Sequence, residues 1–492
     1  MKTFVPVRFR RQVLRCASNA FALSALLAAP LSAPAQQPPS AKTSKPSIVR
    51  AADPAPGEWQ LTSSPISHLL DNNDNFSRDD RFLVVDTRDT VGGGIGNGTT
   101  IMKISISTGI ENLIYAPNPV MTGTNAAPGL GAASYNSIAD EVAFIHGPLV
   151  SETPKLGFYR ATNRRGGVVV ADGSGDLKGF LDFRDVDNEA TTPGAHRGGT
   201  HRHEYTLDGS RVGFTYDDEL LTNYGRTIGL LMPHPRAPGG ASHWAVLLLR
   251  MAPTNGAAPG EIERAADDSW IGARGLMRGF IGRVKEENGS YTNSLFIVDI
   301  PENVDVTTAD AGTKTRYPAP PAGVRVRRIT NTEATGIVRG SHDGTQTAYF
   351  AVADGTRQVF IVPSNGSDRA TDPALRPVQA TRMPTNVTGG LRWHPSGNSI
   401  AAISDGGVFV TCVKPGPLFG TSVFLTARGS GVPAADALVW SHNGKMLAFN
   451  RRVPTYDSAG RLLKDFGGND FRQVFLVMFP DENGNGIADP IE

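Results

Sequence analysis

A short polar turn followed by a strand of alternating apolar residues recurs along this chain, and it constrains the fold more than any other feature. The copy at residues 205–218, YTLDGSRVGFTYDD, shows the pattern clearly. Asp-Gly, Asn-Gly and Ser-Gly pairs supply the positive φ that a tight hairpin turn requires. The alternation after the turn places one face of the strand in a core. The other copies begin at Phe76, Tyr135, Gly340, Trp393 and Trp440.

The spacing of these units predicts how many there are. Successive turn centres are 60, 69, 135, 53 and 47 residues apart, so the longest gap has room for one more copy. Residues 278–301, two apolar strands joined by a polar turn, fit that place. Seven small sheets that cannot bury their faces alone predict an all-β, seven-bladed β-propeller, with six blades as the alternative. The turn centres are Asp80, Asp140, Gly209, Gly344, Gly397 and Gly444.

A second repeated element indicates how the ring closes. Residues 60–62 (QLT), 328–330 (RIT) and 379–381 (QAT) each come shortly before a turn unit. The first of them has no blade before it. We therefore expect residues 59–62 to complete the last blade, beside strands at 437–440, 445–450 and 473–479. Such a closure would remove an open sheet edge.

Two other segments carry local expectations. The longest insertion, about residues 235–273, contains EIERAADDSWIG at 261–272, the one place where we expect a short helix. The glycine-rich run at 92–98 lacks the Lys-Ser/Thr of a phosphate-binding loop and is expected to be a long hairpin tip. No G-x-S-x-G motif supports a serine hydrolase.

The N-terminus has the features of an export signal. Arginines precede an apolar run at 21–31, and Ala33-Pro34-Ala35 fits a small-x-small cleavage site. We expect a signal peptide at 1–35, a flexible leader at 36–56, the propeller at 57–480 and an acidic tail at 481–492. The protein would then be periplasmic or secreted. General secretory and twin-arginine export both remain open, because Arg10-Arg11 matches the latter only loosely.

Charge and cysteine content limit the partners. A net charge of +1 gives no reason to expect nucleic acid, and no apolar stretch is long enough to span a membrane. Cys412 would be the only cysteine after cleavage, so no internal disulfide is expected. We expect a monomer.

Several stretches carry a resemblance to a known family. WHPSGNSIAAIS at 393–404 resembles the repeats of TolB-type propellers. The stretches at 197–203 (RGGTHRH), 214–218 (FTYDD) and 242–244 (SHW) resemble the YidR-like family, whose function is unassigned. The resemblance covers about residues 59–450 and implies a TolB-like propeller without implying an activity.

Histidines form the most distinctive candidate site. His201 and His203 lie two residues apart, so on an extended segment both would point the same way. His243, placed before what reads as the next inner strand, should open on the same face. Together the three could hold Zn²⁺ or Mn²⁺. Alternatively, they hydrogen-bond backbone carbonyls in crowded loops.

This cluster leads to two functional hypotheses. The first is an exported binding or scaffold module for a protein or a cell-envelope glycan, with ligand contacts from Arg197, His201, His203, His243 and Trp244. The second is a metal-dependent carbohydrate-active enzyme, since oligogalacturonate lyases on similar propellers bind a metal through histidines. An acidic sugar would suit guanidinium groups, which pair with carboxylates in a bidentate fork. The candidate arginines are Arg164, Arg165, Arg184 and Arg197.

The end of the chain carries a calcium-loop pattern. DENGNGIADPIE places oxygen ligands at alternate positions before a glycine, as a Ca²⁺ loop requires. Pro490 and the lack of an exit helix argue against an EF-hand, and a solvated acidic tail is the alternative. The expected ligands are Asp481, Asn483, Asn485 and Asp489.

Overall fold

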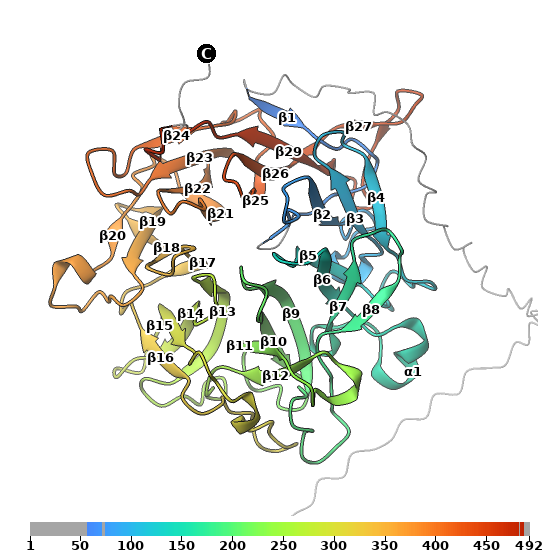
Figure 1. The fold of residues 1–492 in the computed structure, drawn as a ribbon, viewed down its shortest axis with the longest axis vertical. Coiled ribbons are helices and arrows are strands. Elements are labelled where there is room, and N and C mark those ends of the chain that lie inside the picture. Colours follow the sequence, from blue (N-terminus) through green and yellow to red (C-terminus); the bar gives the residue numbers. More distant parts are fainter. Residues whose placement is uncertain (1–56, 71–73, 482, 487–492) are drawn as a thin grey trace, which may run out of the picture. The chain divides into compact units, whose positions relative to one another are not determined.

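The structure, a computed structural model, describes residues 57–70, 74–481 and 483–486. Seven small antiparallel sheets surround a central axis, with one strand of nearly every sheet innermost (Figure 1). The predicted all-β, seven-bladed propeller is therefore confirmed. Within the described residues no helix is long and apolar enough to cross a membrane. The predicted signal peptide and leader, residues 1–56, lie outside the described part.

The blades are numbered along the chain, and the strands of each run from the innermost outward. Blade 1 has β2 (Phe82–Asp86), β3 (Ile101–Ser105) and β4 (Glu111–Tyr115). Blade 2 has β5 (Leu130–Tyr135), β6 (Glu141–His146), β7 (Arg165–Val170) and β8 (Leu177–Phe180). Blade 3 has β9 (Gly198–Tyr205), β10 (Val212–Asp218), β11 (Thr227–Pro233) and β12 (His243–Leu247). Blade 4 has β13 (Ile262–Ile271), β14 (Met277–Lys285), β15 (Tyr291–Asp299) and β16 (Arg325–Arg328).

The last three blades complete the ring. Blade 5 has β17 (Thr335–Gly340), β18 (Gln346–Ala353), β19 (Thr356–Pro363) and β20 (Val378–Gln379). Blade 6 has β21 (Val387–Trp393), β22 (Ser399–Ser404), β23 (Gly407–Cys412) and β24 (Ser422–Phe424). Blade 7 has β25 (Asp436–Trp440), β26 (Met446–Val453), β29 (Phe471–Met478) and β1 (Glu58–Gln60). A hairpin, β27 (Thr455–Tyr456) and β28 (Leu462–Leu463), extends from blade 7; α1 (Thr153–Leu156) is the one α-helix of the described residues.

Ring closure follows the sequence expectation. β1 pairs antiparallel with β29, so the first described strand is the outer strand of the last blade. A buried ion pair fixes this strand: Arg451 Nε lies 2.7 Å from Glu58 Oε1, and both side chains are 3% exposed. Arg451 also donates to the carbonyls of Gly406 and Ala427 in blade 6. One guanidinium therefore ties the two ends of the ring to a neighbouring blade.

The predictions for residues 235–301 and 92–98 are confirmed except for the helix. The extra repeat copy is present, as β14 and β15, and the run at 92–98 is a hairpin tip between β2 and β3. The expected helix at 261–272 is wrong, because these residues form β13, the inner strand of blade 4. Asp267 has φ 57°, and the register of β13 against β14 shifts around it. This bulge interrupts the period-two alternation that would otherwise mark a strand.

The repeated turns share one hydrogen-bond pattern. In blade 3, Thr206 Oγ1 donates to Asp208 and accepts the backbone N–H of Arg211, and Gly209 has φ 65°. The equivalent serine closes the turn in three other blades. A polar residue at the end of the inner strand therefore fixes the hairpin that leads to the second strand. These serines are Ser77, Ser341 and Ser441.

Apolar packing between neighbouring sheets makes up the core. The described residues form seven buried clusters, each shared by two adjacent blades. Tryptophans reinforce three of these interfaces. The indole N–H of Trp270 donates to the carbonyl of Glu204, that of Trp393 to Arg339, and that of Trp440 to Arg392. Each indole therefore reaches the inner strand of the preceding blade.

The closure pair can be tested by a single substitution. Glu58→Gln leaves the buried Arg451 cation uncompensated, so we expect the free energy of unfolding to fall by about 3–5 kcal/mol. Denaturant unfolding of the purified protein measures this change. The matched control is Glu302→Gln, because Glu302 pairs with Arg274 at the surface and should change stability by less than about 1 kcal/mol. Equal effects of the two substitutions would show that the closure pair is not a major support of the ring.

A histidine joins blades 7 and 1 at the same junction. His442 Nε2 lies 2.9 Å from Asp74 and its Nδ1 lies 3.2 Å from Asp80. Burial opposes the charged form, but the two carboxylates outweigh it and raise the pKa of His442 to about 10. The charged imidazole should therefore stabilise the fold fully below the ordinary histidine pKa of 6.5, and this contribution should disappear as pH rises through about 10.

His442→Asn tests this pH dependence. We expect the melting temperature of the variant to lie furthest below that of the unchanged protein near pH 6, with the difference shrinking steadily toward pH 10. Thermal unfolding monitored across that range measures the difference. A difference that stays constant over the whole range would contradict the raised pKa.

Candidate functional site

The inner strands share a local distortion that sequence periodicity does not reveal. Each of the six inner strands β5, β9, β13, β17, β21 and β25 contains a register shift against its neighbour. A residue with positive φ lies at each shift, and in four of the six it is not glycine. A bulge changes the direction of the side chains beside it. These six bulges therefore influence which side chains of the inner strands point toward the axis. The six residues are Ala132, Arg202, Asp267, Gly336, Gly390 and Ala437.

A cavity of about 360 Å³ lies against three of these bulges, those of β9, β13 and β17. Its walls come from the middle of β9, β10 and β13, from β17, and from segments next to β2 and β11. Arg88 closely follows β2 and Arg226 directly precedes β11, so the cavity lies toward the face where the inner strands start. We call this the mouth face. Guanidinium groups dominate the lining, with one carboxylate among them. The charged and titratable lining residues are Arg88, Arg202, Arg226, Arg264, Asp267 and His201.

The guanidinium groups around the cavity differ in how they are held. Arg88 is fixed by Asp86, with Nη2 2.6 Å from Oδ2. Arg226 is fixed by Asp217 at 2.7 Å. Arg264 is exposed. The charges of Arg88 and Arg226 are therefore compensated by neighbouring carboxylates, while Arg264 is accessible to a ligand.

His201 is the uncharged member of the lining. Its Nδ1 lies 3.1 Å from the hydroxyl of Thr215. Burial, reinforced by the nearby Arg164, Arg226 and Arg202, holds the pKa of His201 well below the ordinary value. The imidazole is therefore neutral at physiological pH and offers one donor and one acceptor.

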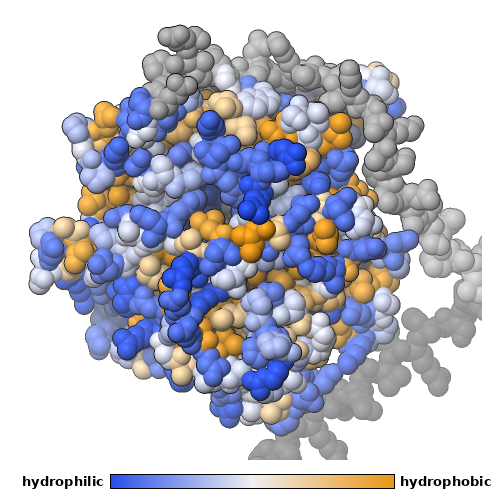
Figure 2. Space-filling view, viewed as in Figure 1, coloured by the Kyte–Doolittle hydropathy of each residue, from blue (hydrophilic) through white to orange (hydrophobic). Residues whose placement is uncertain are grey.

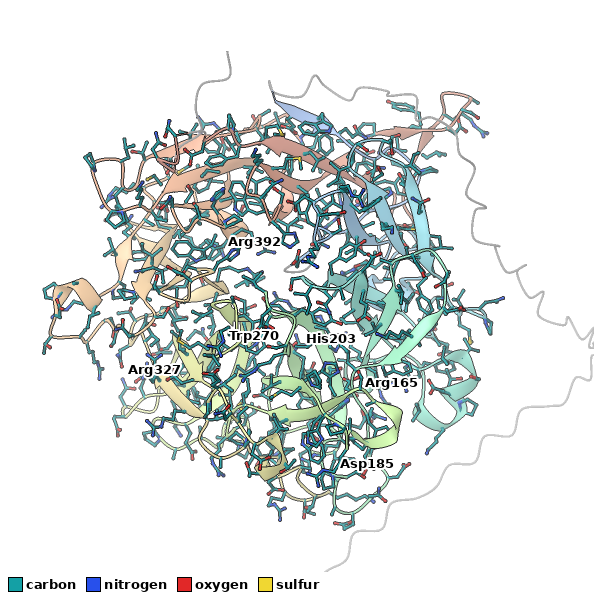
Figure 3. All side chains as sticks on the ribbon, viewed as in Figure 1. Arg165, Asp185, His203, Trp270, Arg327 and Arg392 are labelled. Atoms are coloured by element: carbon teal, nitrogen blue, oxygen red, sulfur yellow. The ribbon has the colours of Figure 1, made fainter. Side chains whose placement is uncertain are left out.

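Below the cavity, a charged triad fixes blades 3 and 4 to each other. Arg278, 1% exposed, lies between Glu204 Oε2 at 2.9 Å and Asp268, and its guanidinium stacks on Trp270 with 4.6 Å to the ring centroid. Figure 3 shows Trp270 and His203 on the inner side of the ring. In the space-filling view, strongly hydrophilic residues surround a few apolar ones near the middle of the ring (Figure 2).

The expected convergence of the histidines is wrong. His201 and His203 lie within β9 rather than in a loop before it, and the bulge at Arg202 separates their directions. His203 is fully buried and packs toward Gly166 of blade 2. Its Nε2 lies 3.0 Å from Thr200 Oγ1. Burial lowers the pKa of His203 to about 4. It does not line the cavity.

The position predicted for His243 is also wrong. It begins β12, the outer strand of the same blade, rather than the next inner strand. Three strand spacings separate β12 from β9, about 14 Å between backbones. Side chains stand perpendicular to a sheet, so the three histidines cannot share one ion at bonds of about 2 Å. Across the described residues, no group of three or more His, Cys, Asp or Glu side chains is arranged to hold a metal.

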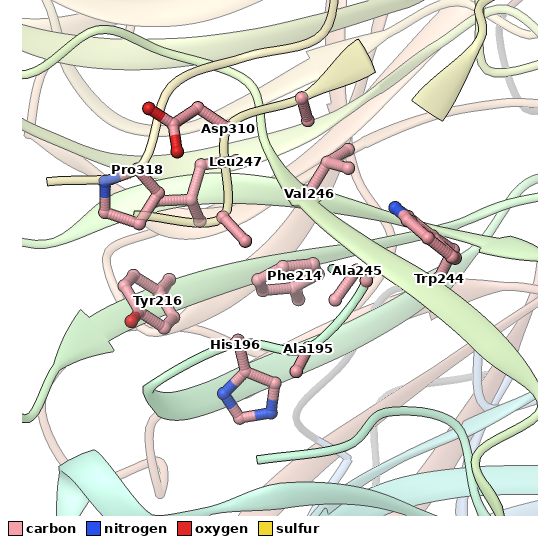
Figure 4. A pocket seen from close by; sticks show the side chains of 13 residues that line it. Ala195, His196, Phe214, Tyr216, Trp244, Ala245, Val246, Leu247, Asp310 and Pro318 are labelled. Atoms are coloured by element: carbon pink, nitrogen blue, oxygen red, sulfur yellow. The ribbon is translucent and has the colours of Figure 1, made fainter. Parts of the chain in front are cut away.

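Two other residues that were expected to contact a ligand, Arg197 and Trp244, are buried in or beside blade 3. Arg197 is fully buried; it pairs with Asp218 at 2.9 Å and donates to the carbonyls of Thr313 and Arg316. Arg197 therefore stabilises the blade and is not accessible to a ligand in this arrangement. Trp244 lines a pocket beside His196, shown in Figure 4. With about 20 Å³ of free volume, that pocket has room for about one water molecule.

The remaining candidate arginines contact protein groups. Arg165 pairs with Glu152 and lies over the Phe180 ring. Arg184 donates to the carbonyls of Thr162 and Gly198. Arg164 lies over Tyr159 and helps to lower the pKa of His201, but it does not line the cavity.

Apart from His201, the residues that line the cavity were missed by the sequence reasoning. Arg202, Arg264 and Asp267 lie in inner strands, where charged residues flank the bulge. An alignment of the inner strands with each other, rather than of the turns that follow them, would have exposed these charges.

The calcium-loop segment forms a compact turn against blade 6. The Asp481 carboxylate accepts the backbone N–H groups of Asn485 and Gly486. Ser399 donates to the Gly486 carbonyl, and the Cys412 thiol donates to the Asn485 carbonyl at 3.4 Å. Asp489 lies outside the described residues, so calcium binding by this loop stays a prediction.

Comparisons with known proteins place the chain in a family. Residues 129–234 match a family model described as "Protein of unknown function (DUF3748)". The chain is also 31% identical over 420 residues to the uncharacterized protein YidR of Escherichia coli (strain K12), covering 79% of this chain and 94% of YidR. The chain belongs to the YidR family.

Three solved structures similar to this YidR-family chain are distant from it in sequence. One is a prolyl endopeptidase, at 13% identity and a TM-score of 0.44, covering 84% of this chain and 50% of that chain. The YidR-family chain thus spans half the length of that structure. The WD40 repeats of RRP9 match at 11% identity and 0.44, covering 86% and 98%. A putative TolB from Agrobacterium tumefaciens matches at 10% and 0.34, covering 75% and 94%.

The calcium prediction can be tested on the tail itself. If the loop binds Ca²⁺ in the weak range of extracellular modules, about millimolar, added Ca²⁺ should slow proteolytic removal of residues 481–492 without changing digestion of the propeller. Mass spectrometry of timed digests measures this. Asp481→Asn keeps a hydrogen-bond acceptor but removes the charge, so it should abolish the protection. Digestion indifferent to millimolar Ca²⁺ would identify the segment as an ordinary acidic tail.

Proposed function

We propose that this YidR-family propeller is a binding module that takes an acidic glycan at the mouth-face cavity. The fold and the family fit a binding or scaffold module. The observation that carries the finer proposal is the 360 Å³ cavity lined by four arginines from several blades. A ligand that fills this cavity would contact several blades at once, so the site exists only in the assembled ring.

The chemistry of the lining favours a saccharide that bears carboxylates. Guanidinium groups pair with carboxylates in a bidentate fork, and Arg264 is accessible for such a contact. The neutral His201 and the carboxylate of Asp267 can hydrogen-bond sugar hydroxyls. The cavity volume lies in the range of about 300–1,000 Å³ typical of small-ligand sites.

We further propose that the module acts outside the cytoplasm, in the periplasm or after secretion. The basic segment, apolar run and Ala33-Pro34-Ala35 of the N-terminus support export. A cell-envelope or environmental glycan would then be encountered where the protein resides. The hypothesis of a metal-dependent enzyme loses its basis in His201, His203 and His243, because these residues do not converge.

Binding of a defined acidic probe tests the proposal. We expect trigalacturonate to bind measurably by isothermal titration calorimetry and the neutral maltotriose not to bind. Arg264→Gln should weaken trigalacturonate binding about tenfold, since a hydrogen bond to a charged group contributes about 1.5–3 kcal/mol. The affinity should also fall as salt is raised.

Arg325→Gln is the matched control, because Arg325 is an exposed arginine on the outer strand β16, away from the cavity. It should leave binding unchanged. Equal binding of the neutral and acidic probes, or equal losses in the Arg264 and Arg325 variants, would contradict an acidic glycan at this cavity.

A further inference from the structure

Arg339, on the inner strand β17, is buried without adequate partners. Only 6% of its surface is exposed. Its one hydrogen bond runs from Nη1 to the carbonyl of the preceding residue, Val338, at 3.5 Å. Among the described residues, Nε and Nη2 have no hydrogen-bond acceptor. A buried unpaired charge is costly, so this guanidinium needs an explanation.

The surroundings of Arg339 add to the cost. Arg392 and Arg202 lie close enough to repel it, while Glu204 and Asp268 attract it. Arg278 already takes one oxygen of each carboxylate, at 2.9 Å and 2.6 Å. The other oxygen of Asp268, Oδ1, is buried and forms no hydrogen bond with Arg339. Around Arg339, three further guanidinium groups (Arg202, Arg278 and Arg392) share the two carboxylates Glu204 and Asp268. Burial first, and the neighbouring arginines second, drive the pKa of Arg339 well below its usual value.

The backbone holds Arg339 and Arg392 in equivalent positions. Each directly precedes the last residue of its inner strand, and each donates from Nη1 to the carbonyl of the residue before it, at 3.5 Å and 2.9 Å. The indole N–H of Trp393 bonds the carbonyl of Arg339, and that of Trp440 bonds the carbonyl of Arg392. Figure 3 shows Arg392 on the inner side of the ring. The two guanidinium groups are thus presented by fixed backbones on adjacent blades.

The geometry of the unsatisfied atoms indicates what is missing. The Nε–H and an Nη2–H of a guanidinium lie along one edge, and that edge takes the two oxygens of a carboxylate or phosphate side by side. In Arg339 this edge is the one that lacks acceptors. A guanidinium does not lose its proton in proteins, so a bound anion on this edge would compensate the charge and satisfy both donors.

We propose that Arg339 anchors a small oxyanion near the propeller axis, with its Nε and Nη2 as the bidentate donors and Arg392 as the neighbouring cation. The ligand class is a carboxylate or a phosphate-type anion. Ile337, two residues before Arg339 on β17, lines the mouth-face cavity, so the site lies next to that cavity. The proposal stands on Arg339 alone and does not require the acidic glycan.

The experiment measures stabilisation of the full protein by anions. We expect millimolar inorganic phosphate or acetate to raise the melting temperature more than sodium chloride at equal ionic strength. Arg339→Met, which keeps the length of the side chain but removes the charge, should abolish this excess rise, and Arg325→Gln should retain it. A response to phosphate but not acetate would identify a phosphate-type ligand, and the reverse a carboxylate.

A second measurement does not depend on how the variant folds. Titration of the unchanged protein with phosphate and with acetate by isothermal calorimetry should show saturable binding of at least one. Arg339→Lys keeps the charge but loses the bidentate edge, so it should weaken that binding about tenfold. Anion effects no larger than those of chloride, or the same affinity in the Arg339→Lys protein, would overturn the proposal. Loss of trigalacturonate binding in Arg264→Gln with retained phosphate binding would separate this site from the glycan site.

Discussion

Packing of one sheet face on the next is the interaction on which the rest of this molecule depends. Every blade buries apolar side chains on both faces, and each of the seven clusters belongs to two blades. No blade can satisfy both of its faces unless the ring is complete. The closure at β1 and β29, the Arg451–Glu58 pair and the His442 contacts all serve that single junction. The polar residues at this junction add to the apolar packing. They hold β1 and β29, two segments far apart in the sequence, in one blade.

The fold could be predicted because its signals are local. The turn at Thr206–Gly209 needs a hydroxyl, an acid and a positive φ within four residues, and such a combination is visible in sequence. The QLT-like triplets were visible for the same reason. Thr62, Thr330, Thr381 and Thr426 each accept a backbone N–H of the third strand, which explains why threonine recurs there. Closure by residues 59–62 was predicted because the first of these triplets has no blade before it.

The candidate site could not be predicted from the same signals. Its residues come from the inner strands, where a bulge breaks the alternation that identifies a strand. β13 was expected to be a helix for this reason, and its Arg264 and Asp267 were not recognised as lining a cavity. His201 and His203 were expected to point together because a regular strand would require it; the bulge at Arg202 separates them. The burial of Arg339 has no sequence signature, since it depends on the neighbouring blades.

The pairing of β1 with β29 also has a consequence for biosynthesis. Thr62 Oγ1 hydrogen-bonds Gln473 Oε1, across 411 residues of chain. As the polypeptide emerges from the ribosome, β1 therefore has no native partner until β29 has been made. The entropy of closing so long a loop rises only slowly with length, so the equilibrium fold tolerates the separation. The kinetic consequence is larger: six blades must assemble with an unpaired strand edge, which is the kind of intermediate that chaperones bind.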